Sequence, residues 1–139
     1  MKLCGGPTGE WPAYNALMIT RIQSVQLFVS DQDRAKDFFI SKLGFTERMD
    51  APMGPDNRWV ELGPPGGGDT SLVVMKPMEG MPSNLGGYAH FIFTVDDIQA
   101  THKELTAKGV EFQDVPSKQE WGWWATLKDP DGNIIGLHQ

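Results

Sequence analysis

The sequence contains an internal repeat, and this repeat limits the possible folds more than any other feature. The segments "LFVSDQDRAKDFFISKLGF" and "FIFTVDDIQATHKELTAKGV" share one plan: an apolar run ending in valine, an acidic cap, a helical apolar pattern and a glycine. Asp31 is as far from Gly44 as Asp96 is from Gly109. Because aspartate can cap the first turn of a helix and glycine can end its last turn, each copy predicts a strand followed by a helix. The chain is therefore expected to consist of two similar units.

Strand-like segments, rich in β-branched and aromatic residues, surround each predicted helix. One precedes each helix, at 22–29 and 89–95, and three follow it, at 45–49, 58–62 and 70–75 in the first half and at 110–115, 123–128 and 133–138 in the second. The segment "DPDG" before the last strand has the composition of a turn. The sequence thus predicts an α+β fold in which paired βαβββ modules form a half-open, mixed or antiparallel β-barrel cleft.

The predicted boundaries make one compact domain with a leading extension. They are an N-terminal extension at 1–20, a first module at 21–77, a linker at 78–87 and a second module at 88–139. The extension lacks the charged start and apolar centre of a signal peptide, and no segment has the roughly 20 apolar residues that span a bilayer.

Composition narrows the choice of partners and compartment. The net charge of −6 and the absence of a basic stripe argue against nucleic acid, and no membrane partner is expected. The only cysteine, Cys4, cannot form a disulfide within the chain, which favours a reducing compartment. We therefore expect a cytoplasmic protein whose partner is a small molecule.

The repeat and the late "DPDGN" motif make the chain resemble the vicinal oxygen chelate superfamily, which includes glyoxalase I, bleomycin-resistance proteins and extradiol dioxygenases. The resemblance covers about residues 21–139. It implies a ligand cleft between two βαβββ units, which in small members often belong to two chains, and so a homodimer. In the metal-dependent members it also implies four metal ligands on four strands, which here fall at Ser24, Val74, His90 and Gly136.

Of these four positions, His90 alone carries a good ligand for a divalent cation, since valine and glycine side chains provide no donor. No cofactor is therefore expected. Alternation along the strands nevertheless places Gln26 beside Ser24 and His138 beside Gly136. A displaced metal site built from His90, His138, Glu61 and Gln26 leaves a divalent metal as the alternative.

Tryptophans suggest a different use for the cleft. In "EWGWWATLKD", strand alternation points Trp121 and Trp123 one way and Trp124 the other, so at least one large ring faces the cleft. These rings could form a stacking wall for a flat or cationic ligand, completed by Trp59, or could cap a core or a subunit interface. His90 and Ile92 should face the cleft, where a neutral imidazole could act as a general base or could instead be purely structural.

Three functions remain open at this point. The first is a metal-free small-molecule pocket that sequesters a ligand or uses His90 as a catalytic group. The second is a metal-dependent lyase, isomerase or dioxygenase with displaced ligands, and the third is a structural dimerisation module. The predicted ligand-binding residues are Ser24, Gln26, Trp59, Glu61, Val74, Ile92, Trp123, Trp124, Gly136 and His138.

Overall fold

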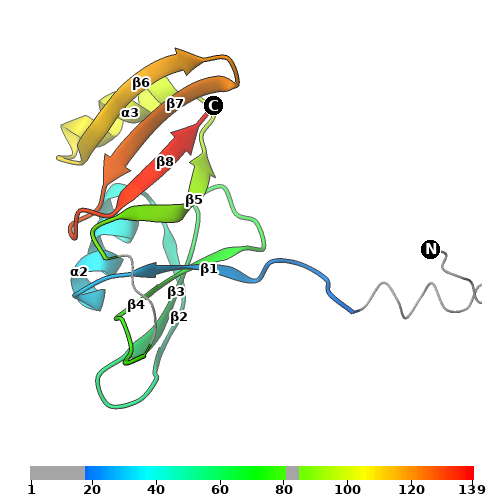
Figure 1. Ribbon diagram of the computed structural model, residues 1–139, viewed down its shortest axis with the longest axis vertical. Helices are drawn as coiled ribbons and strands as arrows, with labels where there is room; N and C mark the ends of the chain where they lie inside the picture. Colours follow the sequence, from blue (N-terminus) through cyan, green and yellow to red (C-terminus); the bar gives the residue numbers. More distant parts are fainter. Residues whose placement is uncertain (1–17, 81–84) are drawn as a thin grey trace, which may run out of the picture.

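A computed structural model describes residues 18–80 and 85–139, which form two four-stranded sheets, each with its own helix (Figure 1). Residues 1–17 of the predicted extension and residues 81–84 of the predicted linker lie outside the described part. Neither helix of that part is long and apolar enough to cross a membrane.

The first module has the predicted βαβββ order. Its elements are β1 (Ser24–Phe28), α2 (Gln32–Asp37) with a π-helical continuation η2 (Phe38–Lys42), β2 (Thr46–Pro52), β3 (Arg58–Gly63) and β4 (Ser71–Met75). The sheet order is β1-β4-β3-β2, with β1 and β4 parallel and the other pairs antiparallel. Asp31 caps α2 as predicted, because its side chain accepts a hydrogen bond from the Arg34 backbone N–H at 3.0 Å.

The second module repeats this plan with β5 (Tyr88–Thr94), α3 (Ile98–Ala107), β6 (Glu111–Gln119), β7 (Gly122–Lys128) and β8 (Ile134–His138). Its order, β5-β8-β7-β6, matches that of the first sheet strand for strand. The acidic cap predicted at Asp96 and Asp97 is made by Asp97, one residue after the aspartate that matches Asp31 in the repeat, and its side chain accepts from the Ala100 backbone N–H. The repeat seen in the sequence is therefore a repeat in the fold, and the α+β prediction is confirmed.

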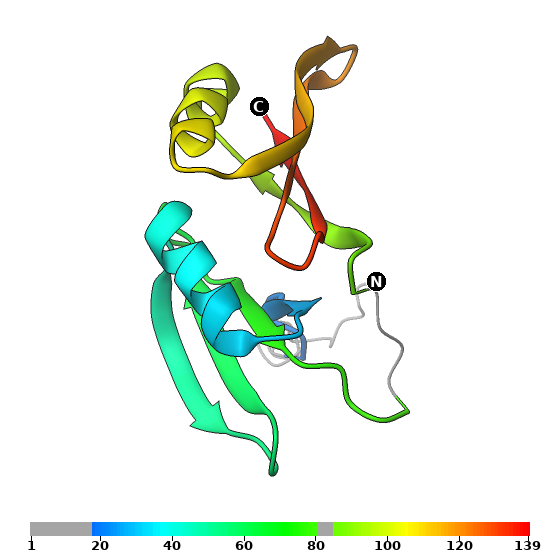
Figure 2. The same cartoon turned by 90° about the vertical axis from the view of Figure 1, so that its left-hand side faces the viewer.

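Each sheet buries the face that lies against its helix. In Figure 2 the two helices lie one above the other on the same side of the molecule. The modules also contact each other through this side, since the Phe45 ring of the first module lies 5.4 Å from the Phe93 ring of the second. We call the opposite face of each sheet, away from the helix, its open face.

The "DPDGN" turn joins the modules as well as two strands. Asp131 accepts hydrogen bonds from the Ser30 backbone N–H at 3.0 Å and from Arg34 Nη2 at 2.8 Å, both in the first module. Buried Asn133 donates from Nδ2 to the Phe28 carbonyl at 2.9 Å. The turn therefore connects the second module to the end of β1.

Candidate functional site

The open face of the first sheet carries a polar network centred on Glu61. Glu61 accepts hydrogen bonds from Trp59 Nε1 at 3.0 Å and from Ser71 Oγ at 2.7 Å, and Arg48 Nη1 donates to Ser71 Oγ at 2.9 Å. The hydrogen bonds from Trp59 and Ser71, with the positive charge of Arg48 nearby, lower the pKa of the Glu61 carboxyl. The network holds a carboxylate that is ionised at neutral pH.

Ser24 and Gln26 lie on the same face as this network. Gln26 is paired with Val73, which is also the partner of Glu61, so these residues share one side of the sheet. The prediction that Val74 faces the cleft is wrong. Val74 is paired with Leu27 and is fully buried in the core beneath α2. Val73 takes the open-face position, because a shift of one residue in a strand moves a side chain to the other face.

The open face of the second sheet brings together most of the residues predicted there. Ile92 is paired with Gly136, and Trp124 with His138, so their side chains share one face. His90 and Ile92 are exposed on it, whereas Phe91 and Phe93 pack against the core, as predicted from alternation.

The three clustered tryptophans are arranged differently from the prediction. Trp121 does not share a side with Trp123, because Trp121 precedes β7 and the alternation is broken at Gly122, whose φ is 124°. The Trp121 ring lies 5.4 Å from the Trp124 ring, in an edge-to-face contact. Trp123 instead packs against the core, so it belongs to the other face.

Trp121, Trp124 and His138 together form an aromatic surface, which we call the aromatic wall. The Trp121 ring is stacked on the His138 ring at 5.7 Å with an interplanar angle of 29°, and His138 Nε2 lies 2.9 Å from the Trp121 carbonyl oxygen. Trp121 is 58% exposed. A stacking wall that includes Trp121 was among the predicted possibilities, but its pairing with Trp124 depends on the turn at Gly122, which strand alternation does not predict.

The residues proposed for a displaced metal site do not converge. His90 and His138 lie on the second sheet, whereas Glu61 and Gln26 lie on the first. Within residues 18–80 and 85–139, no three His, Cys, Asp or Glu side chains lie close enough together to hold a metal ion. Glu61 is also already engaged by Trp59 and Ser71.

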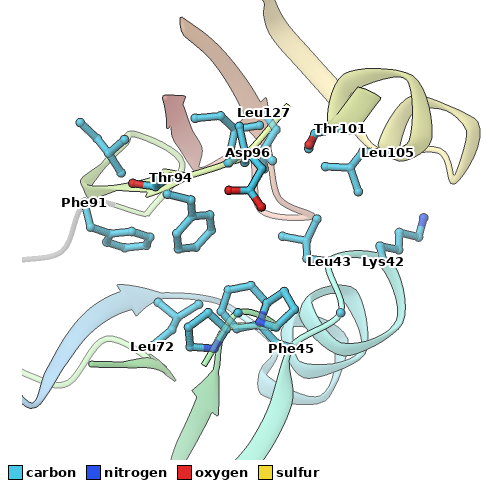
Figure 3. Close-up of a pocket in the computed structure, with 18 of the residues that line it drawn as sticks. Lys42, Leu43, Phe45, Leu72, Phe91, Thr94, Asp96, Thr101, Leu105 and Leu127 are labelled. Atoms are coloured by element: carbon cyan, nitrogen blue, oxygen red, sulfur yellow. The ribbon is translucent and has the colours of Figure 1, made fainter. Parts of the chain in front are cut away.

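A separate apolar cavity of about 910 Å³ lies between the modules on their helix sides. Figure 3 shows Phe45 and Leu72 of the first module facing Phe91 and Leu127 of the second across this space. Of the predicted site residues, Ile92 lines this cavity, and the aromatic wall does not. Apart from Ile92, the predicted site residues therefore lie outside this cavity.

Comparisons with known proteins agree with the fold described above. The chain belongs to the Glyoxalase/Bleomycin resistance protein/Dioxygenase superfamily, whose family model matches residues 21–137. This membership confirms the resemblance inferred from the repeat and the "DPDGN" motif. Uncharacterized protein YetH of Bacillus subtilis (strain 168) is 38% identical over 122 residues, covering 88% of this chain and 100% of that protein.

Solved structures of similar proteins share the fold. TnmS3, described as an antibiotic binding protein from Streptomyces sp. CB03234, is 38% identical with a TM-score of 0.76, covering 88% of this chain and 97% of that one. A superfamily member from Sphaerobacter thermophilus DSM 20745 is 34% identical with a TM-score of 0.78, covering 87% of this chain and 98% of that one.

Proposed function

We propose that this protein binds a planar aromatic small molecule of the antibiotic type without a metal ion, and sequesters it. The observation that carries the proposal is the aromatic wall of Trp121, Trp124 and His138 on the open face of the second sheet. Trp121 is exposed and Trp124 is half-buried, and their indole rings offer a rigid surface on which a flat ring system can stack with little loss of side-chain entropy. The similarity to TnmS3, an antibiotic binding protein, supports this class of ligand.

We further propose that a homodimer forms the binding unit. The Glu61 network and the aromatic wall lie on different sheets, and a cleft with both needs two open faces to meet. The second open face also exposes Ile92 and Trp121, both at 58%, and a contiguous exposed apolar surface of this kind marks an interaction site. Sedimentation should show a dimer at micromolar concentration, and a monomer would contradict this part of the proposal.

Direct titration tests the function. Phenazine is a neutral planar tricycle, proflavine is a planar cation, and spermidine is a flexible cation with no ring. Both planar compounds should quench tryptophan fluorescence saturably and give heat in calorimetry, whereas spermidine should do neither. Binding of spermidine alone would mean that charge and not the aromatic wall is recognised, and binding of none would refute the proposal.

Sequestration and catalysis are separated by recovering the ligand. We expect mass spectrometry to return the planar compound unchanged after long incubation, with and without added zinc, nickel, iron or manganese. Metal-dependent product formation would favour the alternative enzyme, a lyase, isomerase or dioxygenase using His90, His138, Glu61 and Gln26. The proposed compartment is the cytoplasm, on the basis of the single cysteine.

A further inference from the structure

Gly136 has a packing role that its backbone conformation does not explain. It is not among the glycines with a positive φ, so its conformation is open to any residue. A Cβ atom at this position would lie 2.1 Å from Cη2 of Trp124, 2.8 Å from Cζ2 and 2.9 Å from Cζ3. The six-membered ring of the Trp124 indole thus lies directly against the Gly136 backbone, and even a methyl group would displace it.

The contact arises from strand pairing. Trp124 is paired with His138, and Gly136 is two residues before His138, so the ring reaches diagonally across β7 and β8. The family resemblance places the fourth metal ligand at Gly136. In this chain the indole fills the space that such a side chain would need, so Gly136 removes the donor and makes room for the ring.

Trp121 and His138 also hold the aromatic wall in place, on the side of Trp124 away from Gly136. Trp121 meets Trp124 edge to face and stacks on His138, and a Cβ at Gly122 would lie 2.7 Å from His138 Nε2. The interplanar angle of 72° between the two indoles creates a corner with one ring as its floor and the other as its side. Such a corner fits a planar ring system that stacks on one indole and meets the other at its edge.

We propose that the Trp124–Gly136 pair determines ligand class at this site: glycine leaves room for the outer edge of the indole where a metal ligand would stand, and the indole held there selects planar aromatic ligands by face contact. This inference rests on the proposed function, whose ligand class it assigns to two specific residues. Gly136 acts through Trp124 and is a positioning residue, whereas Trp124 contacts the ligand.

A double-mutant cycle with proflavine as the probe tests the pair. Trp124→Ala should weaken binding about tenfold or more, since about 1.4 kcal/mol of lost stacking corresponds to a tenfold change. Gly136→Ala should weaken binding to a similar extent by displacing the ring. In Trp124→Ala/Gly136→Ala the added methyl group meets no indole, so the second change should add little. Trp124→Phe should retain part of the affinity, because it keeps an aromatic face.

The control is Gly66→Ala, which adds the same methyl group where no atom lies within 4 Å. This variant should bind proflavine as the wild type does. Near-ultraviolet circular dichroism provides a readout without ligand, since Gly136→Ala should change the signal of the Trp121–Trp124 pair and Gly66→Ala should not. If Gly136→Ala does not fold, the double variant should fold as Trp124→Ala does, because the clash is then absent.

The outcomes separate this inference from the function on which it rests. If the wild type binds neither proflavine nor phenazine, the proposed function fails and the inference fails with it. If the wild type binds and folded Gly136→Ala retains full affinity, or if the two substitutions weaken binding additively, the pair is not the determinant and the proposed function stands.

Discussion

Removal of the Asn133 side chain should destabilise the protein far more than the loss of an ordinary polar side chain. Asn133 is 1% exposed. Its Nδ2 donates to the Phe28 carbonyl at 2.9 Å and to Asp129 Oδ2 at 2.8 Å, and its Oδ1 accepts from the Gly86 N–H at 2.7 Å. One amide therefore satisfies the end of β1 in the first module and the start of the second.

The expected loss follows from the groups left without partners in Asn133→Ala. Each buried donor or acceptor left unsatisfied costs about 1 to 3 kcal/mol. The half-buried Phe28 carbonyl loses a bond, and so does the N–H of Gly86, which is exposed and can bond water instead. Asp129 keeps two backbone donors through Oδ1. Burial raises the pKa of Asp129 and the Asn133 hydrogen bonds oppose this, so the carboxylate is also less well stabilised in the variant. We expect a total of about 2 kcal/mol.

Urea denaturation measures this loss. With a slope of about 1 to 3 kcal/mol per molar for a domain of this size, a loss of about 2 kcal/mol should lower the midpoint by about 0.7 to 2 M. Asn57→Ala is the matched control, because its side chain also bonds backbone groups, at Lys76 and Arg58, but only within the first module and at a half-buried position. A loss below about 1 kcal/mol for Asn133→Ala, or one equal to that of Asn57→Ala, would refute the reasoning.

Three further predictions test the core, the acid response and the metal question. Phe93→Ala should cost up to about 3 kcal/mol in chemical denaturation, the low end for a large-to-small core change because the Phe93 ring is half-buried. His90→Ala should leave stability nearly unchanged and weaken ligand binding, and the reverse pattern would make His90 structural. Hydrogen bonds and charges from Arg58 and Lys36 lower the pKa of Asp50 from 3.8 to about 2, so its contribution to stability is present above pH 4 or so and is lost as the pH falls toward about 2. In Asp50→Asn the Tm should therefore fall less steeply between about pH 4 and pH 2 than in the wild type. An equally steep fall would contradict this role of Asp50. A chelator should leave the Tm of protein purified without nickel resin unchanged, since a tightly bound ion would raise it; a drop of several degrees that one metal reverses would favour a metalloenzyme.

Much of this fold could be predicted because its signals are local. The aspartate caps at Asp31 and Asp97 depend on a hydrogen bond to a backbone N–H three residues later, so the sequence at the helix start determines them. His90 and Ile92 lie on one face of β5 and Phe91 and Phe93 on the other, and this arrangement depends only on alternation within one strand. Both kinds of feature were correctly predicted from short stretches of sequence.

The predictions were wrong where the face on which a side chain lies depends on the number of residues in a loop or on the conformation of a turn. The assignment of Val74 instead of Val73 came from counting along the chain after Gly63, and an error of one residue reverses the face. Trp121 was placed by extending the alternation of β7 through Gly122, where the backbone turns. The contact of Trp124 with Gly136 joins residues on two strands at a diagonal. No local pattern in the sequence encodes that contact.

The two modules share one topology, and their open faces have nonetheless acquired different chemistry. The first holds an ionised carboxylate, Glu61, fixed by hydrogen bonds from Trp59 and Ser71. The second holds the Trp124 indole against Gly136, with the Trp121 indole in contact with it. If two copies bring these faces together, one wall of the cleft accepts hydrogen bonds or a positive charge and the other offers a flat apolar surface. That combination favours a planar ring system bearing donor groups at one edge.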